Sequence, residues 1–525
     1  MKRIYLSLIS MSTVALSYGQ ISTSVLDFNN VSAYVTDGGI LFNNPTGLPG
    51  YEIPKGSNLH ALYGAGLWYG GEDANGQLKM TATKFIPGLD IFPGPVATAT
   101  MYTTPAYLAN YSPAIWSVTQ AEIDDHVLNY ASPGYITPSS IMDWPGNGDV
   151  AMGISSQLAP YQDENSNGIY EPLLGDYPII RGHKATYIIM NDVAQLHLGS
   201  GSDPIGIEVH VMLYQYATNG ILNDATFIHS TVFNRGAQTL YGFRSSFYAD
   251  GDLGDYSDDY VGTDSIRNMI FTYNGTSVDG EYGINPPAIG IVSLNQQMDG
   301  GGYFSSSAPF PYNDPSSAPS YWNIMNNTWA DGSPWVEGGL GYLGSPGAST
   351  TPSNYLFGGD PLNAAEWSES SLSNIPGDRR MIMNMKSETF SPGAFRCLDM
   401  VVVYGRDTLG PLSSVAALQN NADSLQAYYD AQNYICEANT AGIPETTPSN
   451  YLLYPNPSNG EFTIQFDEKV DGLKLRIVDL SGRLVMDQAY SNTASVSVKL
   501  NEASGVYVLQ IETRKGIYSE RILVK

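Results

Sequence analysis

The sequence is short of basic residues, of cysteine and of long apolar runs. Twenty-four Lys and Arg stand against 51 Asp and Glu, for a net charge of −27. Such an acidic chain repels nucleic acid and anionic lipid and favours divalent cations. We therefore expect no nucleic-acid partner. Beyond the first residues, no stretch approaches the roughly 18 apolar residues that a membrane span needs, so we expect no transmembrane segment.

Only two cysteines are present, Cys397 and Cys436. In an oxidising compartment they can pair, which would tie a strand to the end of a predicted helix. The alternative is two free thiols. We favour the pairing.

Recognisable catalytic motifs are also missing. There is no HExxH, no GxSxG and no P-loop, and the six histidines show no metal-ligand spacing. We therefore name no catalytic residue. A glycosidase remains an alternative, because the fold, and not the spacing in the sequence, brings its two carboxylates together. Glu208, Glu281 and Glu337 are available for that role. A secreted carbohydrate-active hydrolase is thus the alternative to a structural, adhesive or binding protein.

The chain begins with the pattern of a secretory signal peptide. Lys2 and Arg3 precede an apolar run from Ile4 to Leu16, and small residues follow up to Gly19. A positive flank, a short apolar core and a small-residue exit define such a peptide. We predict a signal peptide over residues 1–19 and a body from residue 20 to 436.

Tyrosine, glycine and proline are abundant, with 37, 54 and 32 residues, which is typical of a loop-rich extracellular β protein. Alternating runs over 207–216, 225–234 and 240–249 predict a three-stranded meander. Residues 381–390 and 397–407 predict a strand pair around a Ser-Pro-Gly turn. The fold class we expect is mainly β, a large composite body with one C-terminal amphipathic helix.

That helix is predicted over 412–435, where apolar residues recur at helical spacing. Upstream, Trp68 and Tyr69 lie in a predicted hairpin that turns at 73–76. A sugar-binding aromatic platform is one interpretation of the two rings; packing in the core is the one we favour. His210 and His229 fall on adjacent predicted strands, where we expect hydrogen-bonded structural roles.

A loop within 159–178 has the spacing of a calcium ligand set. Oxygen side chains fall at its first, third, fifth and ninth positions, and Gly168 at the sixth allows a sharp turn. Leu174 occupies the twelfth position, where an EF-hand has its closing Glu, so another residue must complete the shell. The predicted ligands are Asp163, Asn165, Asn167, Ile169, Glu171 and Asp176. The alternative is a turn held by its own Asn and Asp side chains.

A second acidic stretch, DGDLGDYSDD, follows the predicted meander. Its carboxylates repel one another unless water or a cation neutralises them. We therefore predict a second metal site, with a solvated acidic loop as the alternative. The candidate ligands are Asp250, Asp252, Asp255, Asp258 and Asp259.

The last stretch, 451–525, alternates short half-buried strands with Gly, Asn and Pro turns, about seven strands in all, which predicts a small β-sandwich. Its motifs are PNPSNGEFTI, LRIVDLSGRLV and GVYVLQI, with a basic final strand ending ILVK. This segment resembles the type A C-terminal sorting domain of the Gram-negative type IX secretion system. A linker is predicted over 437–450.

The body, too, resembles a known module. NGIYEPLLGDYP, SDPIGIEVHVMLYQY, DGDLGDYSDDYVGTD, DGSPW, FGGDP and DRRMIM occur in the order seen in a widespread body module of type IX cargo proteins, one without an established activity. The likeness implies a single composite body and supplies no reaction.

Together the resemblances imply an exported protein, extracellular or attached to the outer-membrane surface. Its expected partners are the type IX translocon, sortase-like machinery and a glycan or cell-surface ligand. The expected cofactor is Ca²⁺.

Overall fold

The computed structural model describes residues 20–436, 451–479, 483–500, 502–513 and 516–525. The predicted signal peptide and the predicted linker therefore lie outside the described residues. The fold is mainly β, as predicted. The chain divides into two compact units, the second of which comprises Ala121–Met142, Tyr161–Pro178 and the described part of Thr440–Lys525.

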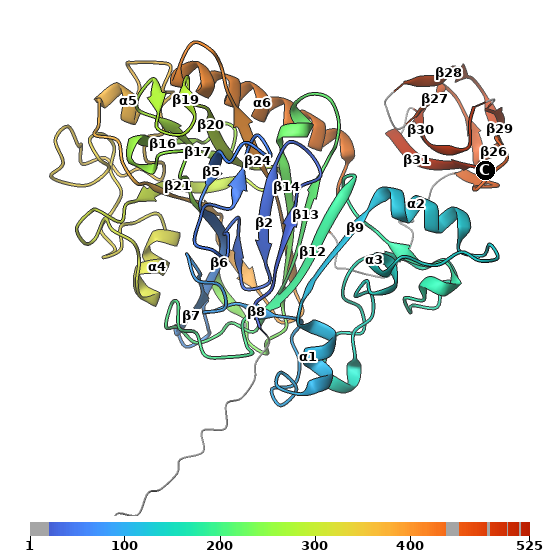
Figure 1. The fold of residues 1–525 in the computed structure, drawn as a ribbon, viewed down its shortest axis with the longest axis horizontal. Coiled ribbons are helices and arrows are strands. Elements are labelled where there is room, and N and C mark those ends of the chain that lie inside the picture. The colour runs from blue at the N-terminus through green and yellow to red at the C-terminus, as the bar shows by residue number, and fades with distance from the viewer. Residues whose placement is uncertain (1–19, 437–450, 480–482, 501, 514–515) are drawn as a thin grey trace, which may run out of the picture. The chain divides into compact units, whose positions relative to one another are not determined.

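Two large antiparallel sheets build the first unit (Figure 1). One has eleven strands, ordered β21-β22-β15-β6-β3-β2-β4-β5, with β1 paired to β2, β7 to β6 and β23 to β15. Its strands are β1 (Thr23–Leu26), β2 (Ser32–Thr36), β3 (Ile40–Leu41), β4 (Tyr51–Glu52), β5 (His60–Leu62), β6 (Gly64–Glu72), β7 (Leu78–Thr81), β15 (Leu240–Asp250), β21 (Met298–Phe304), β22 (Arg380–Met385) and β23 (Glu388–Phe390).

The other sheet has nine strands, ordered β16-β17-β20-β24-β14-β13-β12-β8, with β9 paired to β12. Its strands are β8 (Phe92–Pro93), β9 (Ile115–Thr119), β12 (Lys184–Asn191), β13 (Ile207–Gln215), β14 (Thr226–Asn234), β16 (Asp259–Asp264), β17 (Met269–Asn274), β20 (Ala288–Ser293) and β24 (Phe395–Gly405). A minor hairpin joins β18 (Val278–Asp279) to β19 (Gly283–Ile284).

One hydrophobic core joins the two sheets. Its buried members come from both, for example Trp68 and Phe247 from the first sheet and Val211 and Val402 from the second. Trp68 is fully buried and stacks on Tyr248 with ring centroids 5.2 Å apart. The core role predicted for this tryptophan is therefore confirmed, and it offers no exposed sugar platform.

The predicted meander is wrong in its third strand. β13 and β14 pair as expected, with Val211 opposite Ser230. The free edge of β14 is taken by β24, and β15 crosses to the other sheet, where it pairs with β6 and β22. Alternation along a strand identifies its buried face but does not name its partner.

The predicted pair 381–390 and 397–407 is wrong for the same reason. β22 and β23 both pair with β15 in the first sheet, while β24 lies in the second. The Ser-Pro-Gly turn therefore joins the two sheets and does not close a hairpin.

Helix α6 (Pro411–Gln432) packs on β24, β20 and β17 (Figure 1). Its buried side chains include the predicted apolar stripe: Val415, Leu418, Ala422, Leu425 and Tyr429. The shorter helices are α1 (Pro105–Tyr111), α2 (Gln120–Asn129), α3 (Ser139–Met142), α4 (Ala318–Met325) and α5 (Glu369–Leu372). The prediction of one C-terminal amphipathic helix in the body is confirmed.

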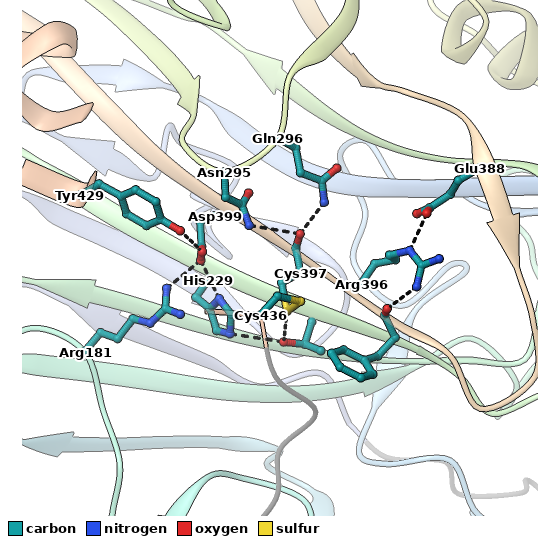
Figure 2. Close-up of a disulfide and its surroundings, with 12 residues drawn as sticks. Arg181, His229, Asn295, Gln296, Glu388, Arg396, Cys397, Asp399, Tyr429 and Cys436 are labelled. Atoms are coloured by element: carbon teal, nitrogen blue, oxygen red, sulfur yellow. Dashed lines mark hydrogen bonds and ion pairs between the residues drawn. A yellow bond between two sulfur atoms is a disulfide. The ribbon is translucent and has the colours of Figure 1, made fainter. Parts of the chain in front are cut away.

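Cys397 of β24 and Cys436, beyond the end of α6, form a disulfide (Figure 2). The favoured pairing is thus confirmed. Beside it, Asp399 accepts hydrogen bonds from His229 Nδ1 at 2.6 Å and Arg181 Nη1 at 2.8 Å, and another from the Tyr429 hydroxyl. This polar cluster joins the helix to the sheet it covers.

The C-terminal segment forms a sandwich of a three-stranded sheet, β25-β26-β29, and a four-stranded sheet, β28-β27-β30-β31. Its strands are β25 (Tyr451–Tyr454), β26 (Glu461–Val470), β27 (Leu473–Asp479), β28 (Leu484–Tyr490), β29 (Thr493–Lys499), β30 (Gly505–Thr513) and β31 (Gly516–Val524). Its buried core, from Tyr451 to Val524, contains residues of this segment alone. The predicted small sandwich is confirmed.

Candidate cation sites

The loop from Asp163 to Asp176 is closed at its base by two short strands of the second unit. β10 (Tyr161–Gln162) pairs with β11 (Tyr177–Pro178) in antiparallel register. Gly168 adopts a positive φ of 78°, with open space around its missing Cβ, so conformation and not crowding requires glycine there. The predicted sharp turn is present.

Asp163 points into this loop and is 5 % exposed. One carboxylate oxygen, Oδ2, accepts a hydrogen bond from Gly168 N at 2.6 Å. The other, Oδ1, is buried without a hydrogen-bond partner. An unpaired buried carboxylate oxygen is costly, and a bound cation would satisfy it.

The remaining predicted side chains of the loop bond to one another and to the loop backbone. Asn167 Nδ2 donates to Glu171 Oε2 at 2.5 Å, and Asn165 Oδ1 accepts from Asn167 N at 3.1 Å. Asp176 accepts from the backbone N–H groups of Glu164 at 2.9 Å and Glu171 at 2.7 Å. Burial raises the pKa of Asp176, and the neighbouring carboxylates raise it further.

This loop therefore combines features of both sequence interpretations. The Asn side chains do form Asx turns, and Asp176 acts as a brace across the loop. Yet the loop also holds one buried carboxylate oxygen without a partner at position one, and the oxygen-bearing side chains at positions three and five contact the one at position nine. Such an oxygen-rich, turn-bound set suits Ca²⁺, which takes six to eight oxygen ligands.

A second group of carboxylates lies in the first unit. Asp250 ends β15, Asp252 follows it in the loop, and Asp378 precedes β22. One oxygen from each lies within 4.8 Å of the others. Asp378 was not predicted as a ligand, because only the pairing of β15 with β22 brings it beside Asp250.

These three carboxylates line a cavity of about 290 Å³. Its wall is completed by Tyr63, Phe85, Tyr256 and Arg380. The cavity is therefore a pocket lined by acidic and aromatic side chains, of a size that admits a hydrated ion or a small polar ligand.

Arg380 is the principal counter-charge of this pocket. Its guanidinium lies 2.6 Å from Asp378 and 3.4 Å from Asp250, but neither contact has hydrogen-bond geometry. Asp314 adds a fourth carboxylate, 3.7 Å from Arg380 and 3.5 Å from Lys84.

Burial raises the pKa of Asp252 to about 7, and the charge of Asp378 adds to that effect. Burial, followed by the charge of Asp252, also raises the pKa of Asp250 well above its usual value. Both shifts have the same two causes, which are burial and the charge of a neighbouring carboxylate.

The other predicted ligands of the second site point elsewhere. Asp255 caps a short turn by accepting from Ser257 N at 2.9 Å, and Asp258 accepts from Thr276 Oγ1 at 3.2 Å. Asp259 is buried and accepts from Leu253 N at 3.1 Å. The structure therefore brings together Asp250 and Asp252 of the predicted five, because β16 begins at Asp259 and turns the chain away.

Both histidines are hydrogen-bonded, as predicted. His210 contacts Glu208 at 3.1 Å and Tyr187 at 2.8 Å, and His229 contacts Asp399. Glu208 is fully buried and also pairs with Arg235 at 2.7 Å, as a structural carboxylate would.

Residues 452–525 match the family of the secretion system C-terminal sorting domain. The small sandwich is thus an export domain, and the chain is a cargo protein of the type IX secretion system, as its tail motifs predicted. It engages the machinery of that system, and its destination is the cell surface or the extracellular space. Among the described residues, no helix combines the length and apolarity needed to cross a bilayer.

No curated protein matches the chain. Solved structures similar to parts of it include an immunoglobulin-like β-sandwich protein from Bacteroides vulgatus, with 14% identity over 14% of this chain and 87% of that one, at a TM-score of 0.12. A polysaccharide lyase aligns with 8% identity over 60% of this chain and 34% of its own, at a TM-score of 0.20. The present chain thus spans about a third of that lyase.

A putative aldose 1-epimerase from Escherichia coli K12 aligns with 11% identity over 74% of this chain and 100% of its own, at a TM-score of 0.24. At TM-scores of this size, the alignments support no inference about substrate or activity.

Proposed function

We propose that this exported protein is a calcium-stabilised extracellular module with a structural, adhesive or binding role, and that the loop Asp163–Asp176 is its calcium site. The ligands would be the oxygens of Asp163, Asn165, Asn167 and Glu171, together with the Ile169 carbonyl; Asp176 would brace the loop from behind.

The observation that carries this proposal is the buried Oδ1 of Asp163, which has no hydrogen-bond partner. Folding removes this oxygen from water without replacing the lost hydrogen bonds. A divalent ion would supply the missing interaction and draw the neighbouring amide oxygens inward. The acidic chain and the calcium-containing space outside the cell favour such an ion.

Calcium binding is expected to stabilise the loop locally, because a ligand that prefers the native state stabilises it. The test is hydrogen exchange of the full chain with calcium and with chelator, read by mass spectrometry over residues 161–178. Calcium should slow exchange there in the wild type and should not do so in Asp163→Asn.

Asp331→Asn is the matched control, because Asp331 also closes a turn, accepting from Ser333 N at 2.9 Å, but lies outside the loop. Equal exchange of residues 161–178 with calcium and with chelator in the wild type would exclude this site.

The alternative function, a secreted carbohydrate-active hydrolase, draws on the other site. The aromatic residues that line the pocket and the raised pKa of Asp252 favour it. The carboxylate oxygens, however, lie within 4.8 Å of one another, closer than the about 5–5.5 Å or 6.5–9.5 Å between the carboxyl groups of glycosidases. Release of reducing sugar from a glycan panel, lost in Asp252→Asn, would favour the hydrolase.

A further inference from the structure

The three pocket carboxylates have the spacing of ligands around one ion. Oxygens bound to Ca²⁺ lie 2.3–2.6 Å from it, so any two of them are at most about 5 Å apart. The oxygens offered by Asp250, Asp252 and Asp378 fall within 4.8 Å of one another. Without an ion, three carboxylates at this separation repel one another.

A second, independent observation comes from Asp250. This residue is 1 % exposed and lines the pocket, and its Oδ1 has no hydrogen-bond partner. The carboxylate is therefore deprived of water on one oxygen, and its other oxygen meets Arg380 at 3.4 Å without hydrogen-bond geometry. An ion in the pocket is the partner this oxygen lacks.

The charges around the pocket point to a divalent ion. Four carboxylates, those of Asp250, Asp252, Asp314 and Asp378, face two cations, Arg380 and Lys84. When all four carboxylates are ionised, four negative charges less two positive charges leave two uncompensated. Histidine and cysteine are not among these ligands, and an all-oxygen set selects a hard cation such as Ca²⁺ over a transition metal.

We propose that Asp250, Asp252 and Asp378 form a second divalent-cation site, selective for Ca²⁺, in this pocket. This site is separate from the Asp163 loop and is open to solvent through the cavity, so water completes the ion's coordination shell. Arg380 is a positioning residue. Its ion pair with Asp378 holds that carboxylate toward the other two. Its positive charge also compensates the negative charge of the carboxylates that a divalent ion does not neutralise.

The site can be tested with Tb³⁺, a luminescent substitute for Ca²⁺ that nearby tyrosines sensitise. Tyr63 and Tyr256 line the pocket and would serve this purpose. In full-length Asp163→Asn, which lacks a key ligand of the loop, Tb³⁺ should still bind, and Ca²⁺ should displace it. Adding Asp378→Asn or Asp252→Asn to that variant should weaken the binding roughly tenfold or more, because Ca²⁺ affinity follows the number of charged ligands.

Asp255→Asn in the same background is the matched control. It removes a charge from the same acidic loop, but its carboxylate caps a turn outside the trio. Tb³⁺ affinity should stay within about twofold of the background, and circular dichroism in chelator would verify that each variant is folded.

Failure to bind Tb³⁺ in Asp163→Asn, or equal weakening by Asp255→Asn and Asp378→Asn, would overturn the pocket site. Neither result bears on the loop, whose own test reads exchange at residues 161–178.

Discussion

The guanidinium of Arg181 lies 2.8 Å from the carboxylate of Asp399, which joins the segment before β12 to β24. Both side chains are largely buried, and the same carboxylate also binds His229 and Tyr429 (Figure 2). Asp399 is thus the centre of the polar contact between helix α6 and its sheet.

Replacing Asp399 by Ala should lower the free energy of unfolding by about 3–5 kcal/mol, because it leaves the buried Arg181 without its partner. Urea denaturation followed by circular dichroism measures this. The comparison variant is Asp423→Ala, which breaks the more exposed pair between Arg267 and Asp423 of α6 and should cost about 1 kcal/mol or less. Similar losses from both variants would show that Asp399 has no special role.

Acid should destabilise the protein through Glu208. Burial alone would raise the pKa of this carboxylate, but its hydrogen bond to His210 and the charges of His210 and Arg235 outweigh burial and lower the pKa to about 2. The ordinary value, which holds in the unfolded chain, is about 4.5. A pKa lowered on folding contributes stability above the unfolded value, and that contribution disappears as the pH falls through the folded value.

The contribution of Glu208 at neutral pH is about 3 kcal/mol by this linkage. Unfolding free energies between pH 7 and pH 2 should therefore fall less steeply for Glu208→Gln than for the wild type. Parallel pH profiles for the two proteins would contradict the assignment. Burial would also raise the pKa of Asp399, but His229 and Arg181 lower it to about 2. Asp399 therefore adds to the acid sensitivity of the wild type and of Glu208→Gln alike.

Removing the disulfide with the double change Cys397→Ala and Cys436→Ala should cost about 3–4 kcal/mol, since the bond closes a loop with a sequence separation of 39. Denaturation of the oxidised wild type, the reduced wild type and the double variant provides the measurement. The reduced wild type should resemble the variant. A double variant as stable as the oxidised protein would mean that the packing of α6 alone holds this end of the body.

Deleting residues 451–525 should stop passage across the outer membrane, because these residues form the sorting domain. In a host with a type IX system, the truncated chain should collect in the periplasm while the full chain reaches the surface or the medium. Cell fractionation with immunoblotting distinguishes the two. The double cysteine variant, which retains the sorting domain, serves as the export control. Secretion of the truncated chain would show that another segment contains the export signal.

Much of this protein follows from local sequence. The strands of the tail, the buried stripe of α6 and the hairpin turn at 73–76 depend on alternation, helical spacing and turn residues that act within a few positions. The same holds for the Asp163 loop, where the turn at Gly168 brings Asn165 and Asn167 beside Glu171. The sorting domain was recognisable because its motifs lie within one short segment.

Only the tertiary structure decided which strands are neighbours and which carboxylates meet. Periodicity identifies 240–249 as a strand, but β6 and β22, the partners of β15, lie far away in the sequence. For that reason Asp378 lies beside Asp250 and Asp252. The side chains of Asp255, Asp258 and Asp259, which are nearer along the chain, lie outside this group. Close spacing in sequence predicts a site within one loop, and a site assembled by strand pairing depends on contacts that no local pattern encodes.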